Sequence, residues 1–270
     1  MITVKKGVAA LGLILSLIVF VIPVILLFLQ SISTPWRFGM LFPDEFTLRG
    51  WNQVLSDPAL LHSLLVTVGI GSAVIVLNLL IAIPAAKALA SKDFRGKGVV
   101  DTLLFLPILI PVLAIAIGLH FAMIRFGLAD SWTGVVLVHL IPTVPYSIRI
   151  FRSAFERTGA RWEDQGRVLG STDWQIFLHI QLPQFTSSIR AAVFLTMVIS
   201  LSQYVLTVII GGGRIVTLPM LYYPYVSSGN DTVLAAFSLL FAAVPVIVAG
   251  IVELLIRLLS PYPSQWNRRG

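Results

Sequence analysis

The side chains that most often carry catalysis or bind metals are few and scattered in this sequence. It contains no cysteine, which excludes disulfides, thiolate metal sites and thiol nucleophiles. Its four histidines lack the spacing of a metal site such as HExxH. No GxxxxGK[ST] stretch forms a Walker A loop for the phosphates of ATP. The pattern therefore predicts no catalytic residue, no metal site and no cofactor in this chain, and it disfavours an enzyme.

A different chemistry is indicated by the polar stretch of residues 161–183, which has the pattern of a docking element. Gly170 suits the left-handed C-terminus of a short first helix. Thr172 with Gln175 three residues later forms a capping box for a second helix, which Pro183 is expected to end. The stretch is therefore predicted to be a helix, a turn and a second helix.

The second of these helices has an apolar face. Trp174, Phe177 and Leu178 have the i, i+3, i+4 spacing that places side chains on one side of a helix. Large apolar side chains that project from a polar segment suit insertion into a groove on another protein. We interpret the segment as a binding surface for a protein partner.

The rest of the chain has the composition of a membrane protein. Of its 270 residues, 57% are hydrophobic and 11% are charged, whereas soluble domains are about 25% charged. The apolar residues are grouped into runs, and a bilayer-spanning helix needs about 20 of them. The first run follows Lys5 and Lys6 and is too long for a signal-peptide core, so we interpret it as a retained anchor. We predict an all-α, polytopic membrane protein with six spans, at residues 7–29, 61–86, 99–124, 133–150, 191–211 and 233–259.

The distribution of basic residues predicts the orientation of these spans. With the N-terminus in the cytoplasm, fifteen of the 19 Lys and Arg residues lie on the cytoplasmic side. Cytoplasmic loops of membrane proteins carry such an excess. We therefore predict a multi-pass protein of the cell inner membrane with both termini in the cytoplasm. The net charge of +7 follows from this bias and does not indicate a nucleic-acid partner.

Carboxylates are placed near the ends of the predicted spans. Asp101 and Glu253 lie close to predicted cytoplasmic ends, where water or cationic side chains can satisfy them. A charge in the middle of a bilayer is costly and is usually kept for function, as in ion-coupled carriers. The pattern disfavours an ion-coupled carrier, so a transporter of this kind would take its energy from another protein.

The fifth predicted span contains a polar group. Ser200, Ser202, Gln203 and Tyr204 are candidates for lining a transport pathway. Hydrogen bonding between packed helices explains such residues equally well. In the fourth span, the shortest of the six, His139 is interpreted as a hydrogen-bonded structural residue.

The 161–183 stretch resembles the signature of the permease subunits of binding-protein-dependent ABC importers, which have the type I importer fold. That signature is EAA, three residues, Gly, nine residues and Ile-x-Leu-Pro. Gly170, the nine residues 171–179 and Ile180-Gln181-Leu182-Pro183 match it in spacing and identity. Asp164-Gln165-Gly166 stands where EAA would be, with Glu163 one position earlier. The resemblance covers about residues 61–259.

This resemblance implies an organisation and a set of partners. Residues 1–60 would hold the first helix and an external loop, 61–259 the permease core with a cytoplasmic coupling loop at 152–190, and 260–270 a cytoplasmic tail. The partners would be ABC ATPase subunits that carry ATP and Mg²⁺, a second permease subunit, identical or related, a solute-binding protein and the bilayer. The residues implied to contact the ATPase are Glu163, Asp164, Gln165, Gly166, Gly170, Trp174, Ile180, Leu182 and Pro183.

Three shorter motifs resemble the importers of polyamines, thiamine or ferric iron. They are Phe46-Thr47-Leu48 with Trp51, Gln203-Tyr204, and Thr217-Leu218-Pro219. The remaining alternative from another class is a membrane scaffold or assembly protein that uses the cytoplasmic loop as a contact surface.

Overall fold

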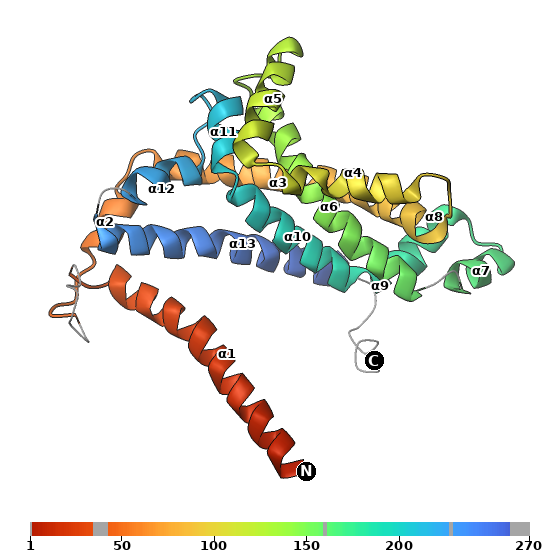
Figure 1. Ribbon diagram of the computed structural model, residues 1–270, viewed down its shortest axis with the longest axis horizontal. Coiled ribbons are helices and arrows are strands. Elements are labelled where there is room, and N and C mark those ends of the chain that lie inside the picture. The colour runs from red at the N-terminus through yellow and green to blue at the C-terminus, as the bar shows by residue number, and fades with distance from the viewer. Residues whose placement is uncertain (1, 35–42, 159–160, 227–228, 260–270) are drawn as a thin grey trace. The chain divides into compact units, whose positions relative to one another are not determined.

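The computed structural model describes residues 2–34, 43–158, 161–226 and 229–259. This part of the chain is helical, and an antiparallel bridge joins Ser33 to Phe46. The predicted cytoplasmic tail at 260–270 lies outside the described residues. The helices of Figure 1, in chain order, are α1 (Ile2–Ser31), α2 (Arg49–Leu55), α3 (Leu60–Ser91), α4 (Lys97–Leu109), α5 (Val112–Arg125), α6 (Trp132–Thr158), α7 (Arg161–Val168), α8 (Asp173–Ile176), the π-helix η1 (Phe177–Gln181), α9 (Leu182–Gln184), α10 (Thr186–Leu201), α11 (Tyr204–Gly211), α12 (Leu218–Val226) and α13 (Asp231–Leu259).

The predicted all-α membrane architecture is confirmed. Three described helices are long and apolar enough to cross a bilayer, namely Leu60–Ser91, Trp132–Thr158 and Asp231–Leu258. Two bent pairs of helices also pass that test, which gives up to five spans among the described residues. The first predicted span, residues 7–29, lies within α1, whose segment Leu15–Ser31 is apolar but shorter.

Two predicted spans are not the single helices that the sequence suggested. The third, 99–124, is divided into α4 and α5, which are bent by 99° relative to each other. Pro111 has no N–H to continue the helix, and Ile110 before it is extended (φ −90°, ψ 138°), as the residue before a proline prefers. The fifth, 191–211, is interrupted between α10 and α11 at Ser202 and Gln203.

The fourth predicted span, the shortest of the six, lies within a long and well-packed helix. Helix α6 runs for 27 residues and contains Pro142 and Pro145. It contacts α4, α10 and α11. The two prolines and His139 lower its hydropathy, but His139 and Pro145 are buried against neighbouring helices. The helix is therefore longer than the span of 133–150 that its short apolar run predicted.

The chain separates into two compact units. The first contains residues 1–63 and 220–243, and the second contains 64–219 and 244–270. In the first unit, the indole N–H of Trp51 donates to the hydroxyl of Ser31 at 3.2 Å. The hydroxyl of Thr232 donates to the carbonyl of Ser33 at 2.9 Å. These bonds attach the end of α1 and the residues after it to α2 and to the start of α13.

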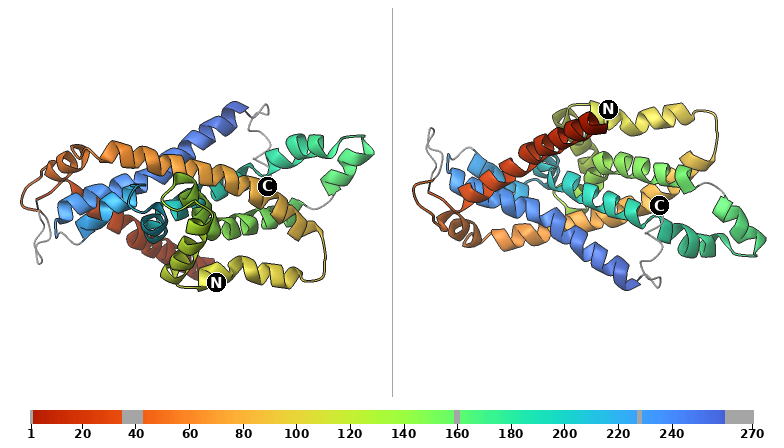
Figure 2. Two further views of the ribbon diagram at one scale, coloured as in Figure 1. Left: turned by 90° about the horizontal axis from the view of Figure 1, so that it is seen from above. Right: turned by 90° about the horizontal axis from the view of Figure 1, so that it is seen from below.

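The second unit has two apolar clusters along α6. One surrounds Val135 and Val138 and includes Ile70 from α3 and Ile210 from α11. The other surrounds Phe151 and includes Ala82 and Ala86 of α3, Phe185 and Ala192. Helices α6 and α10 lie side by side in Figures 1 and 2 and form the frame of this unit. Beyond the end of α6, the segment from α7 to α9 projects from them.

The first turn of α6 gives a test of this packing. A Cβ added at the buried Gly134 would collide with the backbone carbonyl oxygen of Leu128, which also accepts the hydroxyl proton of Ser131 at 2.6 Å. A backbone group cannot move aside as a flexible side chain can. We expect Gly134→Ala to destabilise the protein by about 1–3 kcal/mol, a typical cost of overpacking.

The measurement is the midpoint of thermal unfolding in detergent, followed by size-exclusion chromatography with fluorescence detection. Gly118→Ala is the matched control, because a Cβ there has no atom within 4 Å. Equal midpoints for the two variants would contradict the described packing of α6.

Candidate functional site

The predicted docking element has the expected helix–turn–helix form. Helix α7 ends in a turn at Gly170, whose φ of +81° lies in the left-handed region that favours glycine. The amide of Ser171 donates back to the carbonyl of Gly166 at 2.9 Å and closes this turn. The capping box is also present, with Thr172 N–H bonded to Gln175 Oε1 at 2.9 Å and Gln175 N–H bonded to Thr172 Oγ1 at 3.3 Å.

The predicted end of the second helix at Pro183 is wrong. The helix continues through the π-helix η1 and α9 to Gln184, and Pro183 lies inside α9. A π-turn uses i→i+5 hydrogen bonds, and the wider turn lets the chain continue into a proline that lacks an N–H. The direction changes only at Phe185, where the bend to α10 is 73°.

Gly166 allows the two helices of this element to approach closely. A Cβ at this position would lie 2.9 Å from Ile176 Cγ1 and 3.2 Å from Ile180 Cδ1. Ile176 is buried, at 1% exposure, and fills the space beside the glycine. A small residue is therefore required here, which explains why Gly166 can stand where the resembled signature has alanine.

Glu163 is the residue that joins this element to the rest of the second unit. Its carboxylate accepts a hydrogen bond from the side-chain amide of Gln181, which is 1% exposed in η1. It also forms ion pairs with Lys87 of α3 at 3.2 Å and with Arg167 at 3.8 Å. Asp164, the residue in the signature position, is exposed and forms no ion pair with the described residues. Glu163 therefore holds the element to its surroundings, while Asp164 stays at its surface, and a contact of either residue with an ATPase stays a prediction.

The outer surface of the element is apolar and exposed. Trp174 is 66% exposed and stacks on Phe177, with 5.8 Å between the ring centroids. Val168 and Leu169, which the sequence analysis did not select, are 87% and 84% exposed. Exposed apolar side chains so close together are typical of a protein-binding surface.

A cavity of about 620 Å³ lies between α7 and the η1–α9 segment. Gln165, Gly166, Ile180 and Pro183 line it, so four of the predicted coupling residues face one space. Leu182 is partly buried next to them in α9. No group of three or more His, Asp or Glu residues able to hold a metal occurs among the described residues.

The polar residues of the fifth predicted span are separated by the helix break. Ser200 is buried, and its hydroxyl is 2.9 Å from Nδ1 of His139. Nε2 of the same histidine is 3.0 Å from the hydroxyl of Thr207 in α11. Thr207 was missed by the sequence analysis, although it lies two helical turns after Ser200. The three side chains connect α6, α10 and α11 inside the apolar cluster, which agrees with a structural role for His139.

The helix break satisfies its own backbone groups. The hydroxyl of Ser202 and the side-chain amide of Gln203 both donate to the carbonyl of Ile199, at 2.8 and 3.0 Å. The hydroxyl of Thr207 donates to the carbonyl of Gln203 at 2.6 Å. Tyr204 is partly buried and begins α11. Ser202 and Gln203 therefore stabilise the interruption, and a role for this group in lining a pathway stays a prediction.

A second buried polar contact joins α3 to α10. The side-chain amide of Asn78 donates to the hydroxyl of Thr196 at 2.8 Å, and that hydroxyl is 3.4 Å from the hydroxyl of Ser147 in α6. The sequence analysis did not predict this contact, because each of the three polar residues lies among apolar residues in a different helix.

The carboxylates near the span ends are paired with cations, as the sequence analysis expected. Asp101 of α4 binds Arg152 of α6 at 2.9 Å. Glu253 of α13 binds Arg190 at 2.5 Å and Arg257 at 2.6 Å. These pairs join α4 to α6 and α10 to α13, at the end of the unit where α7 emerges.

Comparison with known proteins identifies the family. The family model for the binding-protein-dependent transport system inner membrane component matches residues 78–261. That match includes all of the docking element and the helices that support it. The chain belongs to this family of multi-pass inner-membrane components.

Relatives are named as permeases of oxyanions. The molybdate/tungstate transport system permease protein WtpB of Thermococcus kodakarensis is 30% identical over 56% of this chain and 61% of its own length. The sulfate transport system permease protein CysW of Escherichia coli is 26% identical over 85% of this chain and 81% of its own. The chain spans under two thirds of the length of the first of these relatives.

The fold is shared with a solved importer. A chain in the crystal structure of a bacterial ABC transporter involved in the import of the acidic polysaccharide alginate matches 93% of this chain and 96% of its own, with a TM-score of 0.71 and 19% identity. The fold is therefore that of the transmembrane subunit of an ABC importer, as the sequence resemblance implied.

The contacts of Glu163 give a test of how the docking element is held. Glu163→Ala removes the partner of Gln181 and Lys87, and hydrogen bonds to charged groups are worth about 1.5–3 kcal/mol. We expect backbone amides in 161–184 to exchange with deuterium about 10–100 times faster in this variant. Asp164→Ala is the matched control and should leave exchange unchanged. A larger effect of the control would contradict the role given to Glu163.

Proposed function

We propose that this protein is the transmembrane permease subunit of an ATP-driven ABC importer, and that it forms the solute pathway and couples to a separate ATPase through the docking element at 161–184. The observation that carries the proposal is the construction of that element. Gly166 and Glu163 fix its two helices together, while Trp174, Val168 and Leu169 remain exposed on its outer surface. A rigid base with an exposed apolar tip is suited to transmit a movement of its partner.

The family supports a set of partners for this subunit. The ATPase subunits would bind ATP and Mg²⁺ and receive the docking element in a groove. A second permease subunit, identical or related, would complete the pathway, and a solute-binding protein would deliver the substrate. A fold relative has been solved in complex with its alginate pentasaccharide-bound periplasmic protein, which supports the last assignment.

The substrate that we propose is a small tetrahedral oxyanion such as sulfate or molybdate. This class replaces polyamine, thiamine and ferric iron as the favoured one, because relatives at 26–30% identity are named as permeases of sulfate and of molybdate or tungstate. The motifs that suggested the cationic substrates also have local structural explanations. The amide of Leu218, for example, donates to the hydroxyl of Thr67 at 2.8 Å, and Thr217 is buried.

Reconstitution tests the proposal directly. The protein should be purified with its partner subunits, placed in proteoliposomes and supplied with the solute-binding protein and ATP. We expect ATP-dependent uptake of sulfate or molybdate, ATPase activity stimulated by the loaded binding protein, and no uptake of spermidine. ATPase activity without uptake of any solute would support the scaffold alternative. Uptake that is abolished by ionophores and needs no ATP would support an ion-coupled carrier.

Gly170 gives a specific test of coupling. Gly170→Arg places a long charged side chain on the turn of the docking element and requires it to adopt a φ of +81°. Nothing lies within 4 Å of a Cβ at this position, so we expect the variant to insert into the membrane and remain folded. Uptake should fall at least tenfold while ATP hydrolysis continues.

Gly96→Arg is the control for this variant. Gly96 also has a positive φ, of +91°, and open space around a Cβ, but it precedes α4 outside the docking element. Wild-type uptake by Gly170→Arg, or the same loss in both variants, would refute the assignment of coupling to this turn.

A further inference from the structure

A second cavity lies between α6 and α10 and adjoins the first one, because Ser187 lines both. It has a volume of about 410 Å³. Its polar lining comes from Tyr146, Arg149, Ser153 and Arg157 on α6 and from Ser187 and Ser188 on α10. No acidic side chain lines it. The cavity therefore has hydroxyl and guanidinium donors and no carboxylate to neutralise them.

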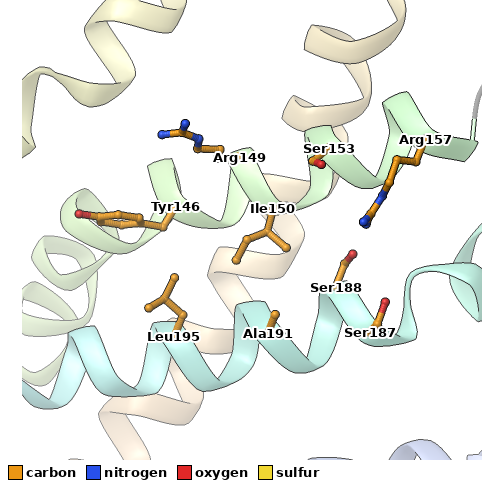
Figure 3. A pocket seen from close by; sticks show the side chains of 9 residues that line it. All are labelled: Tyr146, Arg149, Ile150, Ser153, Arg157, Ser187, Ser188, Ala191 and Leu195. Atoms are coloured by element: carbon orange, nitrogen blue, oxygen red, sulfur yellow. The ribbon is translucent and has the colours of Figure 1, made fainter. Parts of the chain in front are cut away.

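Arg157 is the cation that reaches into the space between the two helices. Figure 3 shows its side chain extending from α6 toward Ser187 and Ser188. It forms no ion pair within the described part of the chain, and the neighbouring Glu156 is bound to Arg152 at 2.9 Å. Its guanidinium group is thus available to bind an anion through two parallel hydrogen bonds.

Ser188 is a mostly buried residue whose hydroxyl faces the cavity. It is 4% exposed and makes no hydrogen bond to any residue that the structure describes. Its side chain points across the cavity toward Arg157 in Figure 3. Because this hydroxyl opens into the cavity and has no partner there among the described residues, it is free to donate a hydrogen bond to a ligand.

The start of α10 adds to the positive potential of the same space. The helix begins at Thr186, after the 73° bend that separates it from α9, so Ser187 and Ser188 belong to its first turn. Backbone N–H groups in the first turn have no partner within the helix, and the helix dipole favours negative charge there. Arginine, hydroxyl groups and a helix N-terminus therefore converge on one side of the cavity.

We propose that Arg157, Ser187 and Ser188 form a binding site for a tetrahedral oxyanion. Arg149 lies eight residues before Arg157, about 12 Å along the helix, and its guanidinium carbon is 5.9 Å from the centre of the Phe105 ring. It is too distant to bind the same ion and acts by raising the local potential. The cavity has room for the ion together with bound water, because one water occupies about 30 Å³.

The inference rests on the proposed function and extends it, because it assigns to the permease itself a site for the transported ion. From the predicted orientation, α6 ends and α10 begins on the cytoplasmic side. The site would therefore hold the ion where it leaves the pathway. The phosphate of a lipid headgroup has the same chemistry. We assign the site to the free ion because Ser188 is only 4% exposed and is reached more easily by a small ion than by a headgroup that carries acyl chains.

The test is direct binding of radiolabelled sulfate and of tungstate to the protein, assembled with its partner subunits, in nanodiscs of phosphatidylcholine. We expect Arg157→Gln to weaken binding about 10–100-fold, since charge-assisted hydrogen bonds are lost, and Ser188→Ala to weaken it about tenfold. Arg157→Lys keeps the positive charge but lacks the planar guanidinium group with its paired donors, so the loss of affinity should be intermediate. Arg95→Gln is the matched control, because Arg95 is exposed on the same predicted side and forms no ion pair among the described residues.

The outcomes separate this inference from the proposed function. Equal binding by the wild type and Arg157→Gln, or an equal loss in Arg95→Gln, would overturn the site even if ATP-dependent uptake is present. Binding that needs Arg157, in a protein without ATP-dependent uptake, would support the site and contradict the proposed function. If neither ion binds in phosphatidylcholine while phosphatidylglycerol protects Arg157 from chemical modification, the ligand is a lipid headgroup and the assignment to a transported ion fails.

Discussion

The docking element depends on the polar contacts that one partly buried carboxylate, that of Glu163, makes with Gln181 and Lys87. Both partners come from outside α7, and each belongs to a different structural segment. Gln181 lies in η1, whose geometry leads into α10, and Lys87 lies near the end of α3. A single carboxylate therefore sets the position of a short helix that has little apolar surface of its own. A helix as short as α7 is not stable in isolation, so these contacts and the packing of Ile176 against Gly166 decide whether the surface exists.

Polar contacts also fix the interior of the second unit. There, isolated polar residues set the register of helices whose other side chains are mostly apolar. Apolar side chains pack against one another in many registers, and lipid gives no hydrophobic preference for any of them. The His139 bonds to Ser200 and Thr207, and the bond from Asn78 to Thr196, each require one alignment of two or three helices. The break after α10 is tolerated because the freed carbonyl of Ile199 has partners within the protein.

Much of this architecture could be predicted from the sequence, because its signals are local. The capping box at Thr172, the left-handed turn at Gly170 and the apolar runs each depend on a few consecutive residues. The errors arose where the outcome depends on distant contacts. Pro183 was expected to end a helix, but the π-turn before it lets the helix continue. Helix α6 extends beyond its predicted span, because its last two turns continue past the apolar run with Phe151, Ala154 and Phe155 buried. Glu163 could not be selected over Asp164 without knowing that Lys87 and Gln181 lie beside it.

The bend between α9 and α10 has a mechanical consequence. Phe185 at the bend is 1% exposed, and its ring packs edge-on against Phe155 of α6, with 4.5 Å between the centroids. The corner is therefore clamped to a neighbouring helix and cannot act as a free hinge. A load applied at Trp174 would tilt α6 and α10 as a single body, instead of being absorbed by rotation at the corner. Under the proposed function, such a clamp would convert a displacement of the docking element into a change in the inclination of these two helices.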